Sequence, residues 1–188
     1  IVGGTMTGKT SLLNACLREI EEISDVNEKI ITIQNSPNLT TNTSNVVSVF
    51  TDFDEVSNAL NLIKRLNANR IIIDDLNDSL GMYNLIQILD NGVGGVIFSV
   101  PALDVNRGLS KLNSYIEELY SEDDEYINQI ETNVNLIIEL YKVLSPGLSC
   151  PETPKEDWAL ALSTYTKLTN NKQTTTKKLI KRIFNIMN

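Results

Sequence analysis

The chain has 188 residues, a net charge of −8 and a pI of about 4.6, so its bulk surface is a poor match for nucleic acid. Hydrophobic residues make up 41% of the chain, which indicates a globular domain and excludes a disordered one. The sequence contains no histidine, so it cannot supply an imidazole base or a histidine metal ligand. The two cysteines, Cys16 and Cys150, have neither disulfide nor metal-site spacing.

No apolar run approaches the length of a membrane-spanning helix, and no signal peptide is visible. We therefore expect a cytoplasmic protein. The chain starts without Met, in what is predicted to be the middle of a strand. We accordingly expect that an N-terminal domain is missing from it.

A glycine-rich segment follows the first predicted strand, Ile1-Val2. It fits G-x-x-x-x-G-K-[ST], the phosphate-binding P-loop. Backbone N–H groups of such a loop form an anion-binding nest, and the next predicted helix, Ser11–Ile23, directs its positive dipole end toward it. A chance glycine-rich turn, the alternative, does not explain this strand–loop–helix context. The predicted nucleotide-binding residues are Gly3, Gly4, Thr5, Met6, Thr7, Gly8, Lys9, Thr10 and Ser11.

Strands and helices alternate along the rest of the chain. β-Branched or continuous apolar runs predict strands over Lys29–Gln34, Val46–Phe50, Arg70–Asp74, Gly95–Val100 and Asn135–Tyr141. Helical spacing of apolar residues predicts helices over Asp54–Leu66, after the N-cap Asp78, over Val105–Leu119 and, briefly, from Tyr126. The pattern predicts an α/β fold of the RecA type, a P-loop NTPase core with a mainly parallel sheet. Because ligands lie at the carboxyl ends of such strands, we expect Lys9, Gln34 and Asp75 to converge.

The C-terminal part differs in composition. Residues 151–188 carry seven Lys/Arg against three Asp/Glu, whereas the rest is strongly acidic. We interpret residues 1–144 as the core domain and residues 145–188 as a linker and a C-terminal helical extension. Two amphipathic helices are predicted there, over Glu156–Leu168 and Lys177–Met187. They either pack on the core or a partner subunit, or dock on an anionic membrane surface through the basic second helix.

Several segments of residues 1–144, in order, resemble the motifs of the secretion ATPases of type II and type IV secretion, type IV pili and conjugation. The P-loop region resembles theirs. The other matching segments are Ile31–Leu39 (I-T-I-Q-N-S-P-N-L, for the Asp box I-x-I-E-D-x-x-E-L), Arg65 with Arg70–Asp75 (for L-R-x-x-P-D-R-I-I-V-G-E, the Walker B region), Leu85–Gly95 (for L-L-Q-A-M-N-T-G-H-D-G) and Ser99–Ala102 (for the His box, T-x-H-A).

The departures from the family pattern fall at the positions that would act on the attacking water. Gln34 and Asn35 replace the acidic pair of the Asp box, Asn77 replaces an arginine after Walker B, and Pro101 replaces the His-box histidine. A glutamine cannot act as a general base, but it can orient an attacking water. The alternative is that Gln34 is a polar strand-end residue with no catalytic part.

The resemblance implies ATP and Mg²⁺ as cofactors. Lys9 would bind the β- and γ-phosphates, and Thr10 and Asp75 would hold Mg²⁺, Asp75 through water. Asp75 takes the position of the Walker B glutamate, with Asp74 just before it, and Gln34 would lie beside the attacking water. The alternative is that both carboxylates only cap the end of a strand.

The resemblance implies an ATP-driven motor subunit that forms a hexameric ring in the full-length protein. Its partners would be secretion or conjugation machinery at the inner membrane, with no direct contact to nucleic acid. We expect slow hydrolysis. An ATP-binding assembly or regulatory subunit that hydrolyses little is the alternative favoured by Gln34, Asn35 and Pro101. A small-molecule kinase is a third possibility, although no acceptor site or lid can be identified in the sequence.

Overall fold

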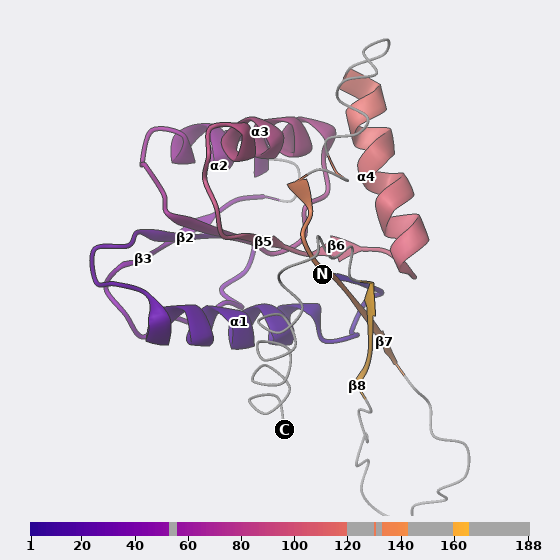
Figure 1. Ribbon diagram of the computed structural model, residues 1–188, viewed down its shortest axis with the longest axis horizontal. Coiled ribbons are helices and arrows are strands. Elements are labelled where there is room, and N and C mark those ends of the chain that lie inside the picture. Colours follow the sequence, from indigo (N-terminus) through magenta and orange to yellow (C-terminus); the bar gives the residue numbers. More distant parts are fainter. Residues whose placement is uncertain (53–55, 120–129, 131–132, 143–159, 166–188) are drawn as a thin grey trace, which may run out of the picture.

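The computed structural model describes residues 1–52, 56–119, 130, 133–142 and 160–165 (Figure 1). The described helices are α1 (Lys9–Ile23), α2 (Val56–Ile63), α3 (Ser79–Asp90) and α4 (Val105–Leu119). The described strands are β1 (Val2–Gly3), β2 (Ile30–Gln34), β3 (Val46–Phe50), β4 (Arg70–Ile73), β5 (Val96–Phe98), β6 (Val100–Pro101), β7 (Ile137–Lys142) and β8 (Leu160–Tyr165). No helix of this described part is long and apolar enough to cross a membrane.

The strands form two four-stranded sheets, in the orders β3-β2-β4-β5 and β6-β1-β7-β8. All pairings are parallel except that of β7 with β8. The two sheets meet at Ser99, which separates β5 from β6. Its amide donates to the carbonyl of Ile73 at 3.0 Å, whereas the next amide, of Val100, donates to Ile1 at 2.8 Å. The strand predicted over Gly95–Val100 is therefore divided into two short strands, β5 and β6, which belong to different sheets.

The helices lie on both sides of the strands, with α1 on one face and α2, α3 and α4 on the other (Figure 1). Alternate residues of the central strands supply the two cores. Ile30 and Ile72 pack with apolar residues of α1. Ile31, Ile33, Ile71 and Ile73 pack with α2, α3 and α4. This three-layer arrangement, with its mainly parallel strands, confirms the predicted fold class.

The C-terminal strand corrects one prediction. Leu160–Tyr165 pairs antiparallel with β7, so this part of the predicted helix Glu156–Leu168 is a strand. The run L-A-L-S-T-Y suits a strand by alternation and by its β-branched threonine, and pairing satisfies the edge of β7. The linker, the basic helix predicted over Lys177–Met187 and most of the helix predicted from Tyr126 lie outside the described residues.

Candidate nucleotide-binding site

The glycine-rich loop joins the central strand β1 to helix α1. Met6 and Gly8 have φ angles of 60° and 94°, so left-handed residues alternate with others, as in an anion-binding nest. The Thr7 hydroxyl donates to the Gly4 carbonyl at 2.9 Å and closes the turn. Gly3 lies where a Cβ atom would come within 2.4 Å of Thr7 Oγ1 and 2.9 Å of the Leu140 carbonyl. The loop therefore requires glycine at position 3 for space and at position 8 for backbone conformation.

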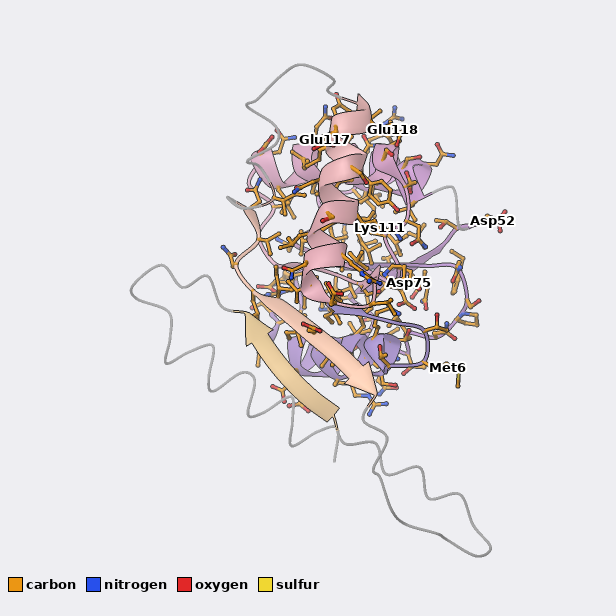
Figure 2. All side chains as sticks on the ribbon, turned by 90° about the vertical axis from the view of Figure 1, so that its right-hand side faces the viewer. Met6, Asp52, Asp75, Lys111, Glu117 and Glu118 are labelled. Atoms are coloured by element: carbon orange, nitrogen blue, oxygen red, sulfur yellow. The ribbon has the colours of Figure 1, made fainter. Side chains whose placement is uncertain are left out.

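The loop residues differ in exposure. Thr5 and Met6 lie at the exposed tip, where the Met6 side chain projects away from the ribbon (Figure 2). Ser11 lies exposed in the first turn of α1. Lys9 begins the helix and is only 8% exposed, and its ammonium donates to the Gly4 carbonyl at 3.1 Å. The amino end of a 15-residue helix thus lies directly behind the loop, where its dipole favours an anion.

Two carboxylates face this loop from the end of β4. Thr10 Oγ1 lies 3.2 Å from each carboxylate oxygen of Asp74. Lys9 Nζ lies 3.9 Å from Asp75 Oδ1. Thr10 and Asp75 are the predicted pair, whereas in the structure Thr10 contacts Asp74 and Asp75 faces Lys9. The predicted convergence of Lys9 and Asp75 is observed. Asp74 lies beside them, and it is Asp74, not Asp75, that contacts Thr10.

Ser99, at the junction of the two sheets, positions both carboxylates. Its hydroxyl oxygen accepts from the Asp75 amide at 2.8 Å and lies 3.0 Å from Asp75 Oδ1 and 3.3 Å from Asp74 Oδ1. With one hydrogen, it donates to one carboxylate at a time. Asp75 adopts a φ of 60°, which the bond to its amide helps to hold. In the sequence Ser99 stands only in the segment that resembles the His box, and nothing in that pattern predicts its contacts with the two aspartates.

The electrostatics suit a bound cation. Burial, followed by the charge of Asp75, raises the pKa of Asp74 above its ordinary value, and hydrogen bonds from Thr10 and Ser99 oppose this shift. Thr10 and Asp74 offer the oxygen ligands that Mg²⁺ prefers. Among the described residues there is no cluster of three His, Cys, Asp or Glu that could hold a metal alone. A cation here would need further oxygens, such as those of phosphates on the loop.

Gln34 does not join this cluster through its side chain. It is 1% exposed, its amide oxygen accepts from the Leu39 amide at 2.7 Å, and its amide nitrogen lies 3.4 Å from the Leu39 carbonyl. Both ends of the side chain therefore hold the loop that follows β2. Asn35, the other amide of the Asp-box match, is half-buried directly after the strand.

A lysine of α4 that belongs to no recognised motif reaches the same edge of the sheet. Lys111 Nζ lies 3.5 Å from the Pro101 carbonyl and 5.8 Å from the centre of the Tyr115 ring. Figure 2 shows it above Asp75. Burial lowers the pKa of Lys111, and the attraction of Asp75 opposes that shift. In the sequence, Lys111 is only a polar residue before the buried Leu112, and nothing there predicts that its side chain reaches this edge of the sheet.

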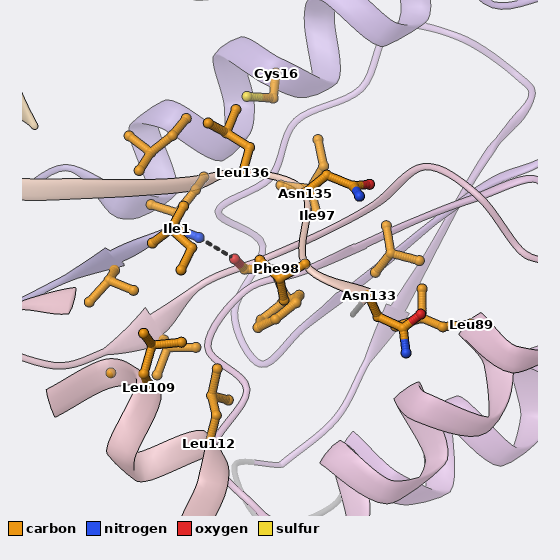
Figure 3. Close-up of a pocket in the computed structure, with 17 residues that line it drawn as sticks. Ile1, Cys16, Leu89, Ile97, Phe98, Leu109, Leu112, Asn133, Asn135 and Leu136 are labelled. Carbon is orange, nitrogen blue, oxygen red and sulfur yellow. Dashed lines mark hydrogen bonds between the residues drawn. The ribbon is translucent and has the colours of Figure 1, made fainter. Parts of the chain in front are cut away.

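A separate cavity of about 250 Å³ lies where β1, β5 and β7 meet (Figure 3). Its lining is mainly apolar, with Cys16 from α1, Leu109 and Leu112 from α4, and Phe98, whose carbonyl accepts from the Ile1 amine at 2.7 Å. None of its lining residues belongs to the segment 3–11 or to the Asp74–Asp75 pair. This cavity is therefore distinct from the phosphate-binding loop, and among the described residues no lysine or arginine lines it.

The loop between β1 and α1, the parallel strands and the carboxylates at the end of β4 together have the arrangement of the RecA-like P-loop fold. Among curated proteins, the chain is 28% identical over 143 residues to the conjugal transfer protein TrbB of Rhizobium radiobacter, a match over 74% of this chain and 42% of that protein. No family profile matches the chain.

Solved structures of secretion ATPases share the fold. The VirB11 ATPase of the Brucella suis type IV secretion system matches 96% of this chain and 49% of its own, with a TM-score of 0.71 and 20% identity. The pilus retraction motor PilT matches 99% of this chain and 52% of its own, with a TM-score of 0.68 and 15% identity. The chain thus shares the fold of these secretion ATPases, and it spans about half the length of the proteins that it matches.

Proposed function

We propose that this chain is the ATP-binding part of a motor subunit of a secretion or conjugation machine. The observation that carries the proposal is the convergence of Lys9, Thr10, Asp74 and Asp75 at the mouth of the glycine-rich loop. Cations and helix N–H groups on one side and carboxylates on the other suit a magnesium-bound polyphosphate. Two similar structures support it: PilT was solved with bound ADP, and VirB11 in complex with sulphate.

In this proposal, the amides of residues 3–11 surround the phosphates, and Lys9 exchanges Gly4 and Asp75 for the β- and γ-phosphate oxygens. Thr10 would ligate Mg²⁺ directly, and Asp74, its observed partner, through water. When bound, Mg²⁺ neutralises charge on the phosphate oxygens. Asp75, beside Lys9 and partly exposed, is the side chain we assign to the attacking water, and it would also contribute to the outer metal shell.

Hydrolysis is expected to be slow. Gln34, the predicted water-orienting residue, uses its amide to hold Leu39, and it would have to leave that contact to reach a water. Pro101 has no imidazole to offer. Loss of one positioned catalytic group typically costs on the order of 10²–10³ in rate. These features favour a second candidate, an ATP-binding assembly or regulatory subunit that hydrolyses little.

Two measurements on the chain separate these functions. Calorimetry with ATP and Mg²⁺ tests binding, and a steady-state phosphate-release assay tests turnover. Binding with turnover identifies a motor, and binding without turnover identifies the assembly subunit. No binding by the folded chain rejects both. Because a partner subunit can supply catalytic groups in trans, the turnover assay is repeated with any copurifying homologue.

Assembly and location extend the proposal. We expect a hexameric ring for the full-length protein, at the cytoplasmic face of the inner membrane and in contact with the secretion or conjugation machinery. The predicted basic helix, Lys177–Met187, is the segment we assign to a partner or to the membrane surface. Light scattering of a full-length protein with ATP tests the ring, and a purely monomeric mass would contradict it.

A further inference from the structure

The apolar cavity where the two sheets meet lies between the two cores of the fold. Of its lining residues, Cys16 and Ile138 belong to the core on the α1 side, whereas Leu112 belongs to the core under α2, α3 and α4. Figure 3 shows Cys16 on one side of the cavity and Leu109 and Leu112 on the other. Its volume is about 250 Å³, and an apolar cavity of this size does not retain water but accepts apolar groups.

Strand β5, which borders this cavity, is more exposed than its sequence predicts. All three of its residues, Val96–Phe98, are only half-buried, whereas Ile71–Ile73 of the neighbouring strand β4 are fully buried. A continuous apolar run in a parallel sheet is typical of a strand that is covered on both faces. Further apolar cover at β5 would therefore stabilise the chain, because it would remove apolar surface from water.

The C-terminal part of the chain leaves the described residues beside this cavity. Tyr165, the last residue of β8, pairs with Ile137 of β7, which lines the cavity. Residues 166–176 connect Tyr165 to the predicted helix Lys177–Met187, and these eleven residues can span at most about 36 Å. The predicted helix is therefore tethered within reach of the cavity.

The composition of the predicted helix Lys177–Met187 suits an apolar cavity. At about 100° per residue, its apolar side chains fall on one half of the helix and its four Lys/Arg side chains on the other. By contrast, residues 120–129 carry four acidic side chains and a single aliphatic one, so they are a poor match for an apolar lining. The apolar residues of the helix are Leu179, Ile180, Ile183, Phe184, Ile186 and Met187.

We propose that the segment Lys177–Met187 is an amphipathic helix whose apolar face docks on the cavity between β5, β7 and α1 of the same chain. The cavity is then an internal docking site. The cationic face of the helix points outward, where it remains available to a partner or to an anionic membrane surface. This inference goes beyond the proposed function, and it does not require that the loop bind a nucleotide.

Cys16 supplies a direct measurement, because it lines the cavity and is only 6% exposed. In the 188-residue chain, Cys150→Ser leaves Cys16 as the one thiol, and its rate of reaction with dithiodipyridine is measured. Phe184→Asp is expected to raise this rate roughly tenfold, since a charge on the apolar face opposes docking. Lys178→Gln is the matched control, because it makes the same change in net charge on the cationic face, and it is expected to leave the rate unchanged.

Cross-linking identifies what occupies the cavity. In the Cys150→Ser chain, Phe184→Cys is expected to join Cys16 through a short bismaleimide within one chain, whereas Asn185→Cys, on the cationic face, is not. Burial raises the pKa of the Cys16 thiol to about 11, so all reactions are compared at one pH. Circular dichroism confirms that each variant folds, and Ile183→Asn replaces Phe184→Asp if the latter does not.

The possible outcomes separate the candidate occupants. Faster labelling of Cys16 in Phe184→Asp but not in Lys178→Gln, together with a cross-link inside one chain, supports the inference. Equal labelling rates in all variants overturn it. A cross-link that appears only between two chains also overturns it, because the occupant is then a second copy. If Phe184→Asp abolishes binding to anionic phospholipid vesicles and leaves the labelling rate unchanged, the apolar face serves the membrane and the inference is wrong.

Discussion

Thr10 and Asp74 are 64 positions apart in the sequence, yet the Thr10 hydroxyl lies 3.2 Å from both carboxylate oxygens of Asp74. The contact joins the first turn of α1 to the end of β4, across the edge where the loop opens. Asp74 is 8% exposed and Ser99 lies on its other side. The two elements that would enclose a phosphate-bound cation are thus already held together by the side chains that would bind it.

Asp74→Asn is expected to stabilise the nucleotide-free chain near neutral pH. The folded-state pKa of Asp74 lies above its ordinary value of 3.8, so folding disfavours its ionised form at pH values above both. As the pH falls through the raised pKa toward 3.8, the carboxyl gains its proton and this penalty disappears. Melting temperatures in EDTA should therefore show a gain at pH 7 that shrinks as the pH is lowered toward 3.8.

The control for this prediction is Asp52→Asn, which changes an exposed aspartate away from the site and should leave stability unchanged. A gain from Asp74→Asn that is the same at both pH values would contradict the electrostatic explanation. The substitution should also weaken binding of ATP in the presence of Mg²⁺, because an amide is a poorer partner for the cation's water shell.

Lys9→Ala is expected to weaken ATP binding by roughly 10- to 100-fold, the equivalent of one hydrogen bond from a charged donor. The reason is the loss of the ammonium that would reach the phosphates, now seen 3.1 Å from the Gly4 carbonyl. Lys29→Ala is the matched control, since Lys29 lies exposed before β2, at the opposite end of that strand from Gln34. Equal affinities of Lys9→Ala and wild type in a calorimetric titration would refute the assignment.

Gln34→Glu is expected to destabilise the fold by about 1–3 kcal/mol, the cost of a buried polar group that loses its partner. The new carboxylate would place an oxygen where Gln34 Nε2 now faces the Leu39 carbonyl at 3.4 Å. Denaturant unfolding measures the change. Gln87→Glu is a control, because its oxygen accepts from Lys64 at 2.7 Å and a carboxylate suits that donor. Higher ATP turnover with unchanged stability would instead favour a water-orienting role for position 34.

Gly3→Ala is expected to disturb the loop and weaken nucleotide binding, because the added methyl would meet Thr7 Oγ1 and the Leu140 carbonyl. Since the carbonyl belongs to the backbone of β7, the loop and not the strand must move. Gly94→Ala is the comparison, since open space surrounds that glycine. Tight binding by Gly3→Ala, measured by fluorescence of a labelled ATP analogue, would show that the loop tolerates the displacement.

Most of the fold could be predicted from the sequence because its strands and helices have strong periodicity. The β-branched run Arg70–Asp74 could only be a buried strand, and observed β4 covers Arg70–Ile73. The C-terminal strand β8 could not be predicted, because the spacing of its residues also suits a helix and only the open edge of β7 decides between them.

The left-handed turn of the glycine-rich loop could be predicted from the sequence, whereas the separate contacts of the two aspartates could not. Adjacent aspartates at a strand end look alike in sequence, and their division between Thr10 and Lys9 depends on the left-handed backbone at Asp75 and its bond to Ser99. The inward position of Gln34 depends on the loop after β2, which brings Leu39 back to the end of the strand. Leu39 packs with Ile30 in the core on the α1 side, and its amide donates to Gln34. This packing of Leu39 is a tertiary contact, and no local sequence pattern predicts it.

The position of β1 has a consequence for the order in which the protein forms. Val2 pairs with Val100 on one side and with Glu139 on the other, so this central strand leaves the ribosome well before both of its partners. Gly3 acquires its Leu140 neighbour only after β7 has been synthesised. Non-local parallel pairings of this kind fold slowly. The glycine-rich loop, although it precedes these partners in the chain, therefore cannot acquire its final surroundings until β7 has been synthesised.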